Sequence, residues 1–164
     1  MSANGSLVEQ VKDTIYKACL LLDDQKWNEW LELCDDDFAY VIKAYSPEIQ
    51  RDMTYMSGSR DELASLTELL PKHNTDHSPL RRHCTVYSVE LNEANNTATA
   101  ITSLAVYQNL LDGVNSHVDA GEAHLFLIGR YIDKLRIDGS DAKFLEREVR
   151  LDTRRLDKGS HWPI

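Results

Sequence analysis

The densest group of chemistry-bearing side chains lies between residues 73 and 83. His73 and His77 are four residues apart, with Asp76 between them and His83 just beyond. Two histidines and a carboxylate can hold a non-haem iron on one face of the metal. The segment KHNTDHSP, residues 72–79, is polar and ends in proline, which is typical of a solvated loop. A loop whose histidines face water is therefore the simpler interpretation of the same residues.

A second group could perform acid–base chemistry. Tyr40, His83 and His124 lie in segments that predict β-strands. If such strands surround a cavity, these side chains could move protons on a buried small molecule. A histidine in a strand can equally bond within the core or face solvent. The sequence leaves both interpretations open, and the first predicts a stand-alone isomerase, dehydratase or hydrolase.

Several enzyme classes are not expected, because their motifs are missing from the sequence. There is no GxGxxG or GxxxxGK[ST] phosphate loop, no HExxH and no GxSxG. The three cysteines, Cys19, Cys34 and Cys84, are widely spaced and form no CxxC pair. Their number and spacing indicate buried thiols in a reducing compartment rather than a disulfide framework.

The charge of the chain bears on its partners. It carries 18 Lys and Arg against 27 Asp and Glu, a net charge of -9, and such a surface repels nucleic-acid phosphates. The opening MSANGSLVEQ has no apolar signal core, and no apolar run in the sequence is long enough to span a bilayer. We therefore expect a cytoplasmic protein without nucleic-acid or membrane partners.

The first half of the chain predicts helices that would cover and position such groups. After a disordered start at 1–6, apolar residues recur at helical spacing over 6–22, namely Leu7, Val11, Ile15, Ala18 and Leu22. A second helix carries Trp27 and Trp30, which we expect in the core, and ends near Leu33.

The segments that follow predict a strand, a loop and a third helix. Residues 38–42 predict a strand, and residues 44–59 predict mostly loop. Ser59 and Glu62 form a capping box that opens the third helix, which Pro71 should end.

The second half predicts a sheet. β-prone segments occupy 84–91, 97–111, 116–137 and 142–151, with hairpin signals at Asp112-Gly113 and Asp138-Gly139. Helices segregated from antiparallel strands make an α+β domain. Long strands with internal glycines should curl. We therefore expect residues 7–164 to form one domain, a cone-shaped curved antiparallel sheet covered by two or three N-terminal helices, with a cavity inside.

Three stretches of the sequence resemble a known family, the small or β subunits of Rieske-type ring-hydroxylating oxygenases. Ser78–His83 resembles the family's Pro…Arg-x-His entry into the sheet, and Glu148–Asp152 resembles its final strand. The remaining matches follow the family's order of an apolar helix, an aromatic-bearing helix, an acidic pair and a Tyr-containing strand; they are Leu21, Leu22, Asp23, Trp27, Trp30, Leu33, Asp36, Asp37, Phe38 and Tyr40.

The resemblance implies a cone fold of the nuclear-transport-factor-2 (NTF2) and scytalone-dehydratase group. It also implies association with catalytic α subunits, commonly as α3β3 with β–β contacts. The α subunits would carry the Rieske [2Fe–2S] centre and the mononuclear iron, and would hydroxylate an aromatic compound or a sulfonate. This chain would be structural, with no catalytic residue or cofactor of its own. The cysteines are consistent with this role, because a Rieske [2Fe–2S] centre needs CxH and CxxH pairs and the sequence has none.

The contact with such a partner is expected at the loop 72–83 and the tail 150–164. The tail is basic on an otherwise acidic chain and ends in an apolar tryptophan segment, which could dock on a partner. Alternatively, Trp162 folds back onto its own domain. The residues predicted for this contact are His77, Arg81, Arg82, Arg150, Asp152, Arg154, Arg155, His161 and Trp162.

Overall fold

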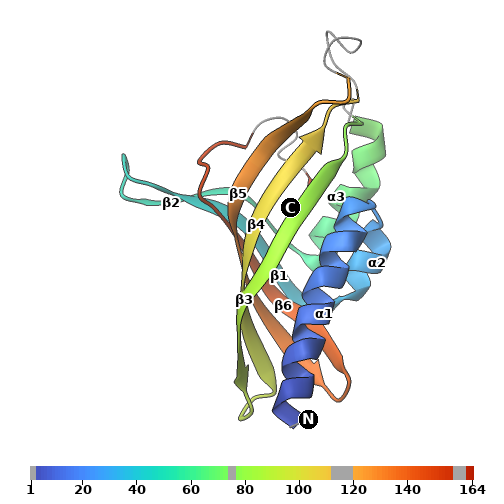
Figure 1. Ribbon diagram of the computed structural model, residues 1–164, viewed down its shortest axis with the longest axis vertical. Helices are drawn as coiled ribbons and strands as arrows, with labels where there is room; N and C mark the ends of the chain where they lie inside the picture. The colour runs from blue at the N-terminus through green and yellow to red at the C-terminus, as the bar shows by residue number, and fades with distance from the viewer. Residues whose placement is uncertain (1–2, 74–76, 112–119, 157–161) are drawn as a thin grey trace.

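A curved six-stranded sheet with helices on one side forms the fold. The computed structural model describes residues 3–73, 77–111, 120–156 and 162–164. Three helices, α1 (Ala3–Asp23), α2 (Trp27–Glu32) and α3 (Arg60–His73), lie against the inner face of the sheet, and Figure 1 shows the β1–β2 hairpin projecting away from them. The strands are β1 (Cys34–Ser46), β2 (Arg51–Ser59), β3 (Leu80–Asn92), β4 (Thr97–Asn109), β5 (Ala123–Asp138) and β6 (Asp141–Leu151).

The strand order is β2-β1-β6-β5-β4-β3. All neighbours are antiparallel except β1 and β6, which run parallel. The predicted α+β cone is thus confirmed, while the expectation of a purely antiparallel sheet is wrong at this one pair. The parallel pair arises because the chain leaves β1 through β2 and α3 and returns to β1 only with its last strand.

Two local signals in the sequence correspond to observed elements. The α1 stripe is buried, with Val11, Ile15 and Ala18 fully covered against the sheet. The capping box forms at the start of α3: the Ser59 N–H donates to Glu62 Oε2 at 2.7 Å, and the Glu62 N–H donates to Ser59 Oγ at 3.3 Å.

Three expectations need correction. Helix α1 begins at Ala3, so residues 3–6 are helical rather than a disordered start. Residues 44–59 are mainly the β1–β2 hairpin, because the β-prone Thr54 pairs with Lys43 of β1 across a turn that contains Pro47. Helix α3 continues past Pro71 to His73, since a proline this close to the end costs only a final backbone hydrogen bond.

The core lies between the helices and the inner face of the sheet. Trp30, Phe38, Tyr40 and Phe144 form an aromatic group with ring centroids 6.2–6.5 Å apart. The expectation that Trp30 is a core residue is confirmed, while Trp27 is half-buried at its margin. Burial of these large rings is the main apolar contribution to the stability of the cone.

A bulge in β6 sets the register of the last hairpin. Counting back from the turn between β5 and β6, Leu135 lies opposite Phe144, but the next residue, Lys134, lies opposite Glu146. Leu145 is therefore the extra residue of the bulge. If the same residues paired one-to-one without a bulge, Asp133 would face the like-charged Glu146. With it, Asp133 faces Arg147.

Candidate functional site

The interior of the cone is held by an ion pair between β5 and β6. Arg147 donates from Nε to Asp133 Oδ1 at 2.8 Å and from Nη2 to Asp133 Oδ2 at 2.9 Å, and both side chains are buried. The guanidinium carbon also lies 3.9 Å from the centre of the Tyr131 ring. Burial raises the pKa of Asp133, against the opposing effect of Arg147. The carboxylate is therefore engaged with Arg147 and not presented to a substrate.

A second buried arginine joins three distant parts of the chain. Arg82, on β3, donates from Nη1 to Asp23 Oδ1 at 2.8 Å and from Nη2 to the Pro163 carbonyl oxygen at 2.9 Å. Its side chain is only 1% exposed. The prediction that Arg82 contacts a partner is therefore wrong: the side chain holds the end of α1 and the residues 163–164 in place.

Tyr40 points into the same region of the core. Its hydroxyl accepts the Ile164 N–H at 2.8 Å and donates to the Ile164 carbonyl oxygen at 3.3 Å. Burial raises its pKa to about 12. Tyr40 is thus a protonated anchor for the C-terminal residues at neutral pH, rather than a proton acceptor.

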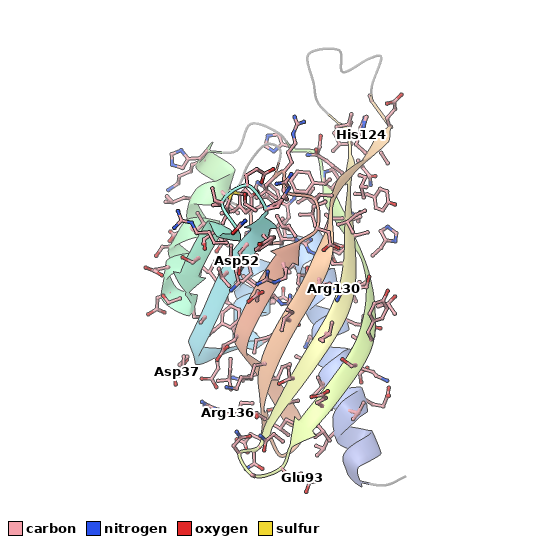
Figure 2. All side chains as sticks on the ribbon, turned by 90° about the vertical axis from the view of Figure 1, so that its left-hand side faces the viewer. Asp37, Asp52, Glu93, His124, Arg130 and Arg136 are labelled. Atoms are coloured by element: carbon pink, nitrogen blue, oxygen red, sulfur yellow. The ribbon has the colours of Figure 1, made fainter. Side chains whose placement is uncertain are left out.

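The two histidines of the predicted acid–base group lie elsewhere. His83 is on the outer face, where its ring packs edge-on against Tyr107 at 5.2 Å. His124 is at the exposed end of β5, far from Arg136 at the other end (Figure 2), and its side chain is 58% exposed beside Glu122. The structure does not bring Tyr40, His83 and His124 together, so the predicted acid–base pocket is wrong as an arrangement of these residues.

The predicted iron ligands are only partly described. His73 ends α3 and is exposed, as is His77, while Asp76 lies outside the described residues. Within the described residues, no three His, Cys, Asp or Glu side chains gather in a way that could hold a metal. The neighbourhood of His73 and His77 is a solvated surface.

The cysteines show a contact that the sequence did not indicate. Cys19 and Cys34 are buried and Cys84 is half-buried. The Sγ atoms of Cys19 and Cys84 are 3.3 Å apart. Burial raises the pKa of Cys34 to about 12, so this third thiol is inert.

The tail residues mostly bind their own chain. Trp162 packs edge-on against Trp27, with ring centroids 5.6 Å apart, so it folds back onto its domain. Arg150 forms two bonds with Asp52, at 3.0 and 2.9 Å, and Arg154 pairs with Glu48, so both arginines brace the β1–β2 hairpin.

Sequence reasoning missed a surface on the outer face of the sheet, which Figure 2 views directly. Tyr107 and Leu125 pair across β4 and β5, and Ile128 lies next along β5. All three are exposed, and we call them the outer patch. A hollow of about 410 Å³ on the sheet has Val41 and Ile132 in its lining, together with Lys43 and Glu148. The sequence did carry one signal for the outer patch, namely apolar residues at positions of β4 and β5 that alternate with the buried ones.

Comparison with known proteins decides the family. A family model described as the ring-hydroxylating β subunit matches residues 17–158. The chain belongs to the ring-hydroxylating β-subunit family. This β subunit is 58% identical to the methanesulfonate monooxygenase hydroxylase subunit beta of Methylosulfonomonas methylovora, over 95% of this chain and 86% of the relative. It is 31% identical to the 2-aminobenzenesulfonate 2,3-dioxygenase subunit beta of an Alcaligenes species, over 94% and 97% of the two chains.

A solved structure supports the fold of this β subunit. A chain assigned as the β subunit of an aromatic-ring-hydroxylating dioxygenase from Novosphingobium aromaticivorans superposes with a TM-score of 0.74, at 23% identity and 95% coverage of both chains. The fold is NTF2-like. The resemblance found in the sequence is therefore confirmed. Among the described residues, no helix is long and apolar enough to cross a membrane.

Proposed function

We propose that this β subunit is part of the hydroxylase component of a Rieske-type oxygenase that acts on a small organic sulfonate. The observation that carries the proposal is that both relatives bear the names of sulfonate oxygenases, one at 58% identity over 95% of this chain. Methanesulfonate is the first substrate to test, because the higher identity is to the methanesulfonate enzyme.

In this proposal the chain supports and orients catalytic α subunits. Its own residues do not fit a Rieske centre, which needs paired cysteines and histidines. His83 adjoins Cys84, but neighbouring strand residues point to opposite faces: His83 packs on Tyr107 outside and Cys84 contacts Cys19 inside. We therefore place the [2Fe–2S] centre and the mononuclear iron on the partner α subunits of an α3β3 assembly with β–β contacts.

The outer patch is the surface we propose for the α subunit. Contiguous exposed apolar residues mark interaction sites, and the core of a stable interface is depleted in charge. The outer patch consists of exposed apolar side chains, and the hollow at Ile132, further along β5, offers a concave seat. Of the contact residues predicted from sequence, those still proposed are the exposed His77, Arg81, Asp152, Arg154 and Arg155, with the half-buried Arg150, and His161, which lies outside the described residues.

The test is native mass spectrometry on the tagged chain purified from its own host, with iron measured on the same sample. We expect an assembly of six chains that contains a larger iron-bearing subunit. Oxygen uptake with the host reductase should depend on methanesulfonate, with benzoate as the control substrate. A metal-free assembly of this chain alone would contradict the subunit role. An iron-bearing complex that ignores sulfonates would contradict the substrate class only.

A further inference from the structure

The Cys19–Cys84 contact joins two elements that are distant in the sequence. Helix α1 runs along β3, the edge strand of the sheet, and the Val86 N–H of that edge donates to Tyr16 Oη on the helix at 3.2 Å. One helical turn further on, Cys19 Sγ lies 3.3 Å from Cys84 Sγ. The two sulfur atoms are therefore held together by elements that are already packed.

The surroundings favour reaction at this pair. The hydrogen bond between Cys19 and Cys84 lowers the pKa of Cys19; burial opposes this, while the charges of Arg147 and Arg82 also lower it. A thiolate is the nucleophilic form of cysteine. Cys84 is half-buried and so lies near the surface of the domain, whereas Cys34 is buried in the core.

We propose that Cys19 and Cys84 are an oxidisable dithiol that hydrogen peroxide converts into a disulfide between α1 and β3. The Cys19 thiolate attacks one peroxide oxygen, the O–O bond breaks, and hydroxide leaves. The Cys84 thiol then attacks the sulfur of the resulting sulfenic acid, the S–O bond breaks, and the thiol proton joins the departing hydroxide. In sum, two thiols lose two electrons and two protons, and one peroxide becomes two waters.

The disulfide would staple the covering helix to the edge strand. It would close a long loop, since the two cysteines are 65 residues apart in the sequence. Closing such a loop restricts the unfolded chain and stabilises the fold. We expect the oxidised chain to melt about 5–10 °C higher than the reduced one. This inference does not depend on the substrate or on the α subunit.

The test treats the reduced, full-length chain with stoichiometric hydrogen peroxide, alkylates the remaining thiols after denaturation, and weighs the intact protein. We expect the loss of two hydrogen atoms, a single alkylated cysteine, and reversal by dithiothreitol. Peptide mapping should link the Cys19 peptide to the Cys84 peptide. Cys34→Ala should behave like the wild type, while Cys19→Ala and Cys84→Ala should not form the link.

Other results would overturn the proposal. Added oxygen atoms in place of lost hydrogens would do so, as would three alkylated cysteines in the wild type or a link that includes Cys34. Peptide mapping of the wild-type chain decides the matter even if a cysteine variant fails to fold.

Discussion

Asp133 on β5 and Arg147 on β6 lie directly opposite each other and form a two-bond ion pair inside the cone. Their meeting depends on the bulge at Leu145, which moves Arg147 into the position that Glu146 would otherwise take. One extra residue in a strand thus replaces a repulsive pair with an attractive one at the centre of the subunit.

Removing one partner of this pair should be costly. Arg147→Met leaves Asp133 buried and unpaired, which we expect to lower the free energy of unfolding by about 3–5 kcal/mol. The double variant Asp133→Leu/Arg147→Met should recover much of this loss, because no lone charge remains. Lys134→Met is the control, since its pair with Glu146 is exposed, and it should change stability by less than about 0.5 kcal/mol. Urea unfolding measures all three; a double variant as unstable as the single one would contradict the argument.

Tyr40→Phe should loosen the residues that follow the last strand. The change removes both hydrogen bonds to Ile164 and leaves buried backbone groups unpaired. We expect a loss of about 1–3 kcal/mol in thermal or urea unfolding. Tyr45→Phe removes an exposed hydroxyl from the same strand and should be neutral. Equal effects of the two variants would show that the Ile164 contact contributes nothing.

The outer patch predicts an assembly defect without a folding defect. Leu125→Glu places a charge at the centre of the patch, where Leu125 is 48% exposed, and Leu20→Glu on α1 is the matched control at 65% exposed. We expect Leu125→Glu to abolish co-purification with the α subunit while its melting temperature stays that of the wild type. Leu20→Glu should assemble normally. If both variants assembled, the α subunit would have to bind elsewhere.

Gly129→Ala should destabilise the pairing of β5 with β6, in which Gly129 lies opposite Leu151. A Cβ at this position would run into the Arg150 carbonyl oxygen, which belongs to the backbone and cannot swing aside. We expect a loss of about 1–3 kcal/mol by urea unfolding. Gly58→Ala adds a Cβ that meets only ordinary contacts at 3.5 Å and should change little. If Gly129→Ala left the free energy of unfolding unchanged, the two strands could move apart to accept the Cβ without loss of stability, and the argument would fail.

The brace on the β1–β2 hairpin should respond to acid. Hydrogen bonding to Arg154 lowers the pKa of Glu48 from 4.5 to about 2. Because the folded pKa is the lower one, the stabilisation is present above pH 4.5 and is lost as the pH falls toward 2. NMR titration of the carboxyl carbon should show the low value, and Arg154→Gln should return it toward 4.5. A wild-type Glu48 that titrates at its ordinary value would contradict the brace.

The sequence predicted the features that depend on neighbours along the chain. The α1 stripe and the Ser59–Glu62 capping box are patterns within a few residues, and both appear in the structure. Strand β2 was missed because Ser57, Gly58 and Ser59 suggest a loop, and only pairing with β1 makes it a strand. Local propensity gives little weight to such pairing.

The features of the site depend on register and on distant contacts. A hairpin at Asp138-Gly139 was predictable, but the bulge that brings Asp133 to Arg147 was not. Likewise, no spacing rule connects Cys19 with Cys84, or Tyr40 with Ile164. The exposure of His83 follows from which face of β3 turns inward, and the sequence left that choice open.

Arg82 has a consequence for how the molecule opens. Chain ends usually fray before the rest of a domain. Here a single side chain bonds both Asp23, at the end of the first helix, and Pro163, next to the last residue. The end of α1 and the residues 163–164 therefore belong to one cooperative unit with the edge strand β3, and the Ile164 amide should exchange its hydrogen only when that unit opens as a whole.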